Sequence, residues 1–238
     1  MPYHVGMKFK ALTFDCFGTL IDWETGILRA LAMLCERYGI DEPPPRGELL
    51  ALYAQLEAQA EHGEYRPYRD VLADVTKGVA ARFGFQLSLA DQTLLADSIK
   101  GWPAFNDTAN SLRELKQHYK LGILSNVDDD LFEGVLPRLG LQGVGGFDLL
   151  VTAQQIESYK PGRAHFHEAL NRLGIKKDEL LHVAQSKKHD VAPCNELGIR
   201  CVWVDRQGGR GGASGEYDAR PDMVVPDLAS LVGELVSV

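Results

Sequence analysis

The sequence predicts an α/β fold: a Rossmann-like, doubly wound parallel sheet as the core, with an inserted all-helical cap domain. Two observations lead to this prediction. Apolar runs of strand length alternate with helical patterns through the second half of the chain, as parallel sheets require. After the first such run, residues 22–102 show several helical patterns and no convincing strand.

The core strands are predicted from five short apolar runs: 9–14, 120–124, 147–152, 180–184 and 200–204. The helical patterns between them carry ordinary end signals. Gly174 and Gly198 follow two of them, and Asp107 is placed to cap a helix over 109–118. The glycine-rich stretch 206–215 matches no phosphate-binding fingerprint, so we expect a surface loop there.

The insert is predicted to contain four helices, over residues 25–38, 47–62, 68–83 and 89–99. The predicted domains are therefore a core of residues 1–21 and 103–238 and a helical cap of residues 22–102. Because the insert follows directly on the strand that ends at Asp15, it would cover that residue as a lid, exclude water and select the substrate.

Composition narrows the function classes. The chain has 238 residues and a net charge of −8, which argues against a nucleic-acid or anionic-membrane surface and still allows an anionic small-molecule substrate. Its four cysteines have no C-x-x-C spacing, as expected for reduced thiols in a cytoplasmic protein. Residues 1–10 hold no apolar stretch of signal-peptide length, and no run reaches transmembrane length.

Polar residues follow several predicted strands at the point where each strand ends. In a doubly wound sheet these positions gather at one edge, where such folds place their chemistry. Any one of them is more often a helix cap or a solvated side chain, but their combination indicates an active site. The candidate catalytic residues are Asp15, Thr19, Ser125, Lys160 and Asp190, and the candidate substrate-binding residues are Phe17, Asn126, Ser186 and Glu57.

These motifs resemble the haloacid dehalogenase superfamily over nearly the whole chain. The matching segments are Asp15-x-x-Gly18-Thr19, Ser125-Asn126, Lys160-Pro161 and Asp190, and the insert occupies the place of that superfamily's first-type cap. The chain is most similar to the L-2-haloacid dehalogenase (type II) group, because Phe17 stands where phosphatases carry an aspartate. Similar enzymes are often dimers, so the resemblance also leaves a homodimer open.

The resemblance implies a hydrolase that acts on a small 2-substituted carboxylic acid, with a carbon–halide bond as the default target. Asp15 would attack carbon and form an ester, while Lys160 keeps Asp15 ionised. The hydroxyls of Thr19 and Ser125 would orient the Asp15 carboxylate, and Asp190 would activate the water that hydrolyses the ester. Asn126 matches a position that helps to hold the halide and the substrate.

Three other functions stay open. A magnesium-dependent phosphatase would lack the acid that Phe17 replaces, and Asp15 and Asp190 alone supply few oxygen ligands for Mg²⁺. We therefore expect no metal or cofactor, with Mg²⁺ reserved for the phosphatase alternative. A non-catalytic binding homologue would have no need of the five candidate catalytic residues. Hydrolysis of a strained ring, such as a cyclic imino acid, is the third alternative.

The cap departs from the dehalogenase pattern. Dehalogenases carry an arginine over the halide, but the corresponding place near residues 53–57 has none. Glu57 could protonate an amine leaving group, although a solvated helix face is the commoner role for such a residue. A substrate carboxylate could bind Lys187, Arg66 or Arg69, and Phe166 replaces a tyrosine.

Overall fold

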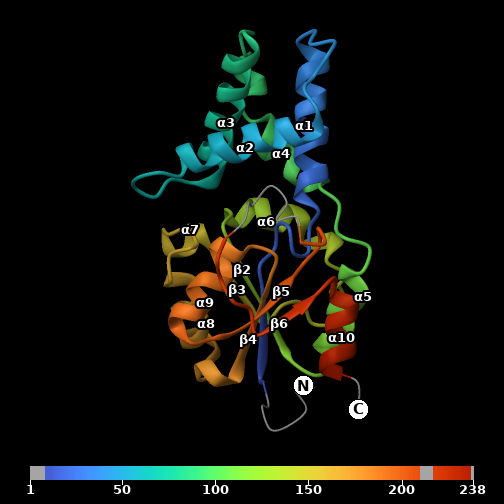
Figure 1. The fold of residues 1–238 in the computed structure, drawn as a ribbon, viewed down its shortest axis with the longest axis vertical. Coiled ribbons are helices and arrows are strands. Elements are labelled where there is room, and N and C mark those ends of the chain that lie inside the picture. Colours follow the sequence, from blue (N-terminus) through green and yellow to red (C-terminus); the bar gives the residue numbers. More distant parts are fainter. Residues whose placement is uncertain (1–8, 210–216, 237–238) are drawn as a thin grey trace.

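The computed structural model describes residues 9–209 and 217–236. Two expectations, the absence of a signal peptide and the glycine-rich surface loop, concern stretches that include residues 1–8 and 210–216, which lie outside that range. The described chain forms a six-stranded sheet in the order β3-β2-β1-β4-β5-β6, and every pairing is parallel. The predicted α/β class with a parallel sheet is confirmed (Figure 1).

Five of the strands lie where the apolar runs predict them: β1 Ala11–Phe14, β2 Lys120–Ser125, β3 Leu149–Thr152, β4 Leu180–Ala184 and β5 Arg200–Val204. The sequence gives no warning of β6, Met223–Val225. This strand lies at the edge of the sheet and has only three residues, and Val224 is 54% exposed, so no buried apolar run marks it.

Helices cover both faces of the sheet (Figure 1). On one side lie α7, α8 and α9 (Ala153–Ile156, Ala164–Leu173 and Ala192–Leu197), and on the other α5 and α10 (Thr108–Lys116 and Leu228–Val236). Gly174 and Gly198 end α8 and α9 in the left-handed conformation, as predicted. Asp107 does not cap α5 with its side chain. Its carboxylate accepts hydrogen bonds from Arg206 and from the N–H of Leu228, the first residue of α10, and so links α5 to α10.

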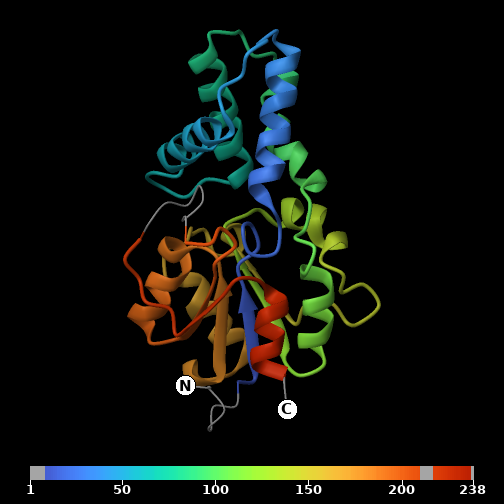
Figure 2. The same ribbon diagram turned by 45° about the vertical axis from the view of Figure 1, so that its right-hand side comes forward.

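The segment between β1 and α5 in the chain is largely helical. It contains α1 Trp23–Arg37, α2 Arg46–Ala60, α3 Tyr68–Phe83 and α4 Leu94–Ser98, which stand together beyond one end of the sheet (Figures 1 and 2). The single helix predicted over residues 89–99 is wrong. Ser88 caps a short 3₁₀ turn instead, and the chain then forms α4 and a second 3₁₀ turn. We call this helical segment the cap.

The cap is fastened to the core where α3 begins. Asp128, which precedes α6 (Asp129–Val135), accepts hydrogen bonds from the backbone N–H groups of Tyr68 (2.8 Å) and Arg69 (2.9 Å). A carboxylate is favourable at a helix N-terminus, where backbone N–H groups lack partners. The core therefore holds the first turn of α3, and with it the Tyr68 ring, in a fixed place.

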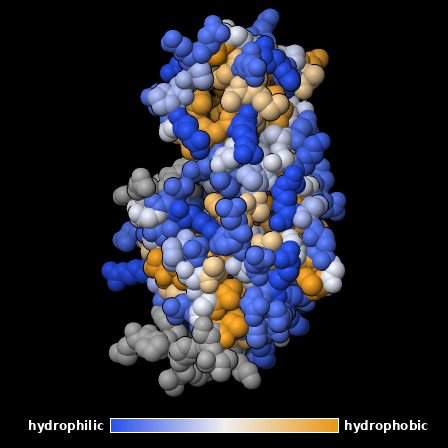
Figure 3. Space-filling view, turned by 90° about the vertical axis from the view of Figure 1, so that its right-hand side faces the viewer, coloured by the Kyte–Doolittle hydropathy of each residue, from blue (hydrophilic) through white to orange (hydrophobic). Residues whose placement is uncertain are grey.

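Hydrophilic side chains cover most of the face in Figure 3, with apolar side chains gathered in the cap and in smaller groups lower on the same face. Among the residues that the structure describes, no helix has the length and apolar character needed to cross a bilayer.

Candidate active site

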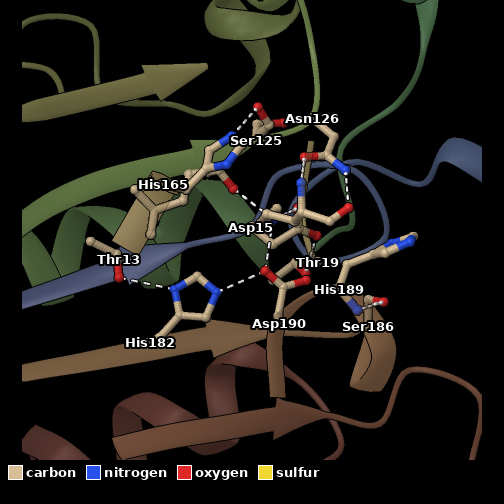
Figure 4. A network of polar contacts seen from close by, with 12 residues as sticks. Thr13, Asp15, Thr19, Ser125, Asn126, His165, His182, Ser186, His189 and Asp190 are labelled. Carbon is tan, nitrogen blue, oxygen red and sulfur yellow. Dashed lines mark hydrogen bonds and ion pairs between the residues drawn. The ribbon is translucent and has the colours of Figure 1, made fainter. Parts of the chain in front are cut away.

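The carboxyl ends of the three central strands bring the candidate residues together. Strand β1 is hydrogen-bonded between β2 and β4. Asp15 follows β1 directly, Ser125 ends β2, and Asp190 lies in the single π-helical turn Lys187–Val191 after β4. Parallel strands place these ends at one edge of the sheet, and the polar residues converge there (Figure 4).

The carboxylate of Asp15 is held at both oxygens. Lys160 Nζ lies 2.9 Å from Oδ1, and the Thr19 hydroxyl donates to Oδ2 over 2.9 Å. The same hydroxyl accepts a hydrogen bond from the Gln185 N–H at 2.9 Å, which ties it to the end of β4. Two donors from separate loops thus fix the orientation of the Asp15 carboxylate.

Lys160 is buried and links three groups. Besides Asp15, its Nζ donates to Asp190 Oδ1 (2.7 Å) and to the Leu124 carbonyl (2.8 Å). Burial by itself would lower the pKa of Lys160, but the two carboxylates outweigh burial and hold that pKa above its ordinary value. The lysine therefore stays charged between the two aspartates.

The two aspartates differ in acidity. Burial and the charge of Asp190 raise the pKa of Asp15, and Lys160 opposes this shift without reversing it. Burial would also raise the pKa of Asp190, but Lys160 and a 2.9 Å contact with His182 Nε2 outweigh it and lower that pKa. The geometry thus holds Asp190 as a stable carboxylate and leaves Asp15 the more basic of the two.

Asp190 keeps one oxygen for chemistry. Lys160 and His182 both contact Oδ1, and the other His182 nitrogen lies 2.9 Å from the Thr13 hydroxyl. Within the described chain, the buried Oδ2 has no hydrogen-bond partner. An unpaired buried carboxylate oxygen is costly unless a water or ligand binds it.

The two serines occupy different environments. Ser125 Oγ is buried, lines the cavity and has no partner among the described residues. Ser186 Oγ accepts a hydrogen bond from the His189 N–H at 3.1 Å and so begins the π-helical turn that carries Asp190. Ser125 is thus free to bind a ligand, whereas Ser186 also shapes the loop.

Asn126 holds the backbone of Lys160. Its Nδ2 donates to the Lys160 carbonyl (3.0 Å), and its Oδ1 accepts from the Lys160 N–H (2.7 Å). Asn126 also lines the cavity. It therefore positions Lys160, and its expected role in holding the halide and the substrate stays a prediction.

A cavity of about 420 Å³ opens over these residues. Its floor, as we call the core residues beneath it, includes Asp15, Ser125, Lys160 and Asp190. Its roof, formed by the cap, includes Ala54, Glu57, Glu61 and Tyr68. Phe17 and Trp23 also line it, so all but one of the predicted site residues face this space; the exception, Thr19, supports Asp15 from behind.

Glu57 does not lie on a solvated helix face. It lines the cavity, and its Oε1 accepts hydrogen bonds from the hydroxyls of Tyr53 (2.8 Å) and Tyr68 (2.5 Å). Burial raises the pKa of Glu57, and the two tyrosines oppose that shift without reversing it. The same stretch of the cap has no arginine over the cavity. Ala54, which lines the roof there, supplies only a methyl group.

The cations proposed to bind a substrate carboxylate lie elsewhere. Arg66 pairs with Asp74, Arg69 with Asp97 and Asp130, and Lys187 Nζ sits 4.0 Å above the Trp203 ring. Lys188 lines the cavity instead, together with His189, whose pKa burial lowers to about 4. Sequence analysis missed Lys188, His189, Tyr68 and Glu61, because no local pattern tells which polar side chains of a helix or turn face a cavity.

Lys160 engages the two acids that a Mg²⁺ ion would use. The inner oxygens of Asp15 and Asp190 share one ammonium group, which lies between them. Within residues 9–209 and 217–236, no three or more His, Cys, Asp or Glu side chains form a group able to hold a metal ion. Since Mg²⁺ can be held by one or two carboxylates together with waters and a substrate phosphate, a reaction without metal stays a prediction.

Fold and site together define a class of protein: a capped parallel α/β enzyme with a buried aspartate, bound to a lysine, directly after its first strand. The family model described as haloacid dehalogenase-like hydrolase matches residues 12–204. The chain belongs to this family, as the motif resemblance predicts.

Similar proteins share nearly the full length. The (S)-2-haloacid dehalogenase of Pseudomonas putida is 27% identical over 97% of this chain and 98% of its own, and that of Pseudomonas fluorescens is 29% identical over 97% and 98%. The solved L-2-haloacid dehalogenase of Xanthobacter autotrophicus superposes with a TM-score of 0.80 at 22% identity, over 97% of this chain and 99% of that one. The fold with its helical cap is therefore that of the L-2-haloacid dehalogenases.

Proposed function

We propose that the protein hydrolyses the bond between carbon 2 and a leaving group in a small 2-substituted carboxylic acid, with halide as the default leaving group. An oxygen of Asp15 attacks carbon 2, a C–O bond forms, and the halide departs with the electron pair of the C–X bond. The product of this step is an ester between Asp15 and the acid. Lys160 and Thr19 hold the attacking carboxylate in line.

Water then cleaves the ester. Asp190 Oδ2 takes a proton from a water molecule as that water attacks the side-chain carbonyl carbon of Asp15. Lys160 and the Ser125 hydroxyl stabilise the oxyanion, whose collapse breaks the bond between the Asp15 carbonyl carbon and the ester oxygen. The departing oxygen takes the proton from Asp190 and leaves as the 2-hydroxy acid. The second proton of the water passes from Asp15 to solvent and restores the carboxylate, so the net reaction consumes one water and releases one hydrogen halide.

The observation that carries this proposal is the pairing of two unequal aspartates on one lysine. Asp15 is fully hydrogen-bonded, as a positioned nucleophile should be, while Asp190 keeps Oδ2 unpaired for a water. The relatives that are 27–29% identical to the chain are (S)-2-haloacid dehalogenases, which supports carbon–halide cleavage. Phe17 cannot protonate the leaving alcohol of a phosphate ester, and we propose that the reaction needs no metal.

A paired assay tests the proposal. Halide release is measured on a panel of L- and D-2-halocarboxylic acids with chelator present, and phosphate release on an aryl phosphate with and without Mg²⁺. We expect halide release that survives the chelator and disappears in Asp15→Asn. Phosphate release that requires Mg²⁺, without halide release, would contradict the proposal in favour of the phosphatase alternative.

One observation favours a second leaving group. Glu57, in the roof, has a raised pKa and could protonate an amine, whereas a halide needs no proton. Hydrolysis of a strained cyclic amine is therefore the second candidate, by the same ester on Asp15. The panel for the first assay should include such a ring. A homodimer stays a prediction, which sedimentation of the purified protein would test.

A further inference from the structure

The roof of the cavity contains two carboxyl groups that carbon–halide cleavage does not use. Both tyrosine hydroxyls contact Glu57 through Oε1, so Oε2 is left without a hydrogen bond among the described residues. The hydroxyls of Tyr53 and Tyr68 also lie 3.0 Å apart, which locks the three side chains together. Glu61, one helical turn beyond Glu57, lines the same cavity.

These carboxyl groups lack a matching cation. Burial and the charge of Glu57 raise the pKa of Glu61 to about 8, and burial raises that of Glu57. Lys188, in the turn of the core that carries Asp190, opposes both pKa shifts without reversing them. Because this lysine is exposed to solvent, it compensates the two carboxyl groups only in part. In the floor, by contrast, Lys160 is fully committed to Asp15 and Asp190. A positive group that entered the cavity would meet an uncompensated acidic roof.

The walls of the cavity also favour a positively charged ligand. Four aromatic side chains line it: Phe17, Trp23, Tyr68 and Tyr159. The faces of aromatic rings attract cations, most strongly where water is excluded. The floor also offers two buried atoms that have no partner among the described residues, Ser125 Oγ and Asp190 Oδ2, and these favour a ligand in the space between floor and roof.

We infer that the substrate carries a basic nitrogen, which Glu57 binds from the roof while Asp15 attacks carbon from the floor. The chemical class is a small carboxylic acid with an amine or ring nitrogen close to carbon 2. This inference rests on the proposed function, since it assigns the substrate class of the same cavity. Lys188 at the rim is placed to meet the carboxylate of such an acid.

The protons balance in either binding state. An ammonium ion that enters replaces the proton of Glu57, which is lost to solvent as the ion pair forms. A substrate that enters with a neutral nitrogen leaves Glu57 protonated. Where that nitrogen is itself the leaving atom, the C–O bond to Asp15 forms as the C–N bond breaks, and the nitrogen keeps the electron pair and takes the Glu57 proton. Water that later cleaves the ester gives one hydrogen to the product hydroxyl and one to Glu57, so water has added across the C–N bond.

Two unreactive probes of the same ring size isolate the nitrogen. Proline, as either enantiomer, and cyclopentanecarboxylate both present a carboxylate on a five-membered ring, and only proline has a ring nitrogen. Their affinities are measured by calorimetry and by the change in tryptophan fluorescence, to which Trp23 in the cavity lining contributes. We expect one enantiomer of proline to bind at least about tenfold more tightly than cyclopentanecarboxylate, as for a buried charge-assisted contact.

Variants locate the source of the preference. Glu57→Gln keeps the shape of the side chain. In this variant the affinities for proline and for cyclopentanecarboxylate should come within about twofold of each other. Glu48→Gln, at an exposed position of the same helix, should keep the preference. Equal affinities in the unmodified protein, absence of measurable proline binding, or a preference that survives in Glu57→Gln would each overturn the inference. None of these binding results depends on a reaction at Asp15. Failure of the inference can therefore be distinguished from failure of the proposed function.

Discussion

The floor of the cavity and its roof handle buried charge in different ways. In the floor, Lys160 lies within 2.9 Å of both aspartates, and each of the three charges has a partner. In the roof, the hydrogen-bond partners of Glu57 among the described residues are the neutral hydroxyls of Tyr53 and Tyr68, Glu61 lies beside it, and Lys188 offsets only part of their shifts. The charges of the floor are thus paired before any substrate arrives, whereas those of the roof are paired by the substrate. Changes in the floor should therefore affect every substrate, and changes in the roof should separate one substrate from another.

The largest effect is expected from Asp15→Asn. Loss of the nucleophile should lower kcat by at least about 10³-fold for every accepted acid, because no other described carboxylate occupies its place at the end of β1. Steady-state kinetics on the most reactive acid of the panel would measure it. Glu48→Gln serves as the control, and a loss confined to one substrate would break the distinction between floor and roof.

Lys160→Met should cost stability as well as activity. Removing the buried ammonium leaves Asp15 and Asp190 unpaired in the core, which typically costs about 3–5 kcal/mol. Urea unfolding followed by circular dichroism would show the loss. Part of it should return at low pH, where the two carboxyls take up protons. Stability equal to that of the unmodified protein would mean that the three charges are not coupled as the distances suggest.

Asp190→Asn should stop the reaction halfway. The amide cannot take a proton from water, so ester hydrolysis should slow by about 10²- to 10⁴-fold while formation of the ester continues. Mass spectrometry after mixing with substrate should detect protein with the acid attached to Asp15. Recovery of unmodified protein together with loss of turnover would assign Asp190 to the first step instead.

The acid limb of the pH profile should reflect the raised pKa of Asp15. The nucleophile must be ionised, so kcat/KM should rise with pH through a pKa above the ordinary aspartate value of about 3.9. The pH dependence of kcat/KM with a non-titrating substrate measures this directly. A limb at or below the ordinary value would show that Lys160 prevails over burial.

The smallest effect is expected at the junction of cap and core. Asp128→Ala removes the acceptor that holds the first turn of α3, and Tyr68 with it. We expect KM to rise by about three- to tenfold with little change in kcat. Asp130→Ala breaks only an exposed contact with Arg69 and should leave both unchanged. An equal effect of both variants would show that this tether does not position the roof.

The floor could be predicted from the sequence and the roof could not, for a physical reason. Asp15, Ser125 and Asp190 follow buried strands, and parallel pairing alone fixes where strand ends meet. Glu57 lies on a helix whose orientation depends on tertiary packing, so its residue type and spacing fit a solvated face equally well. The sequence predicts that Asn126 belongs to the site but does not predict its hydrogen bonds to the Lys160 backbone, because these bonds join segments far apart in the chain.

The central claim is that Asp15 becomes esterified to carbon, and one measurement tests it most directly. The enzyme, in excess over the most reactive acid of the panel, completes a single turnover in water enriched in oxygen-18. The account predicts that the label enters the Asp15 carboxylate and that the first product molecule carries unlabelled oxygen, since water attacks the ester carbonyl. Label in the product, with none in Asp15, would show that water attacks carbon directly and would contradict the account.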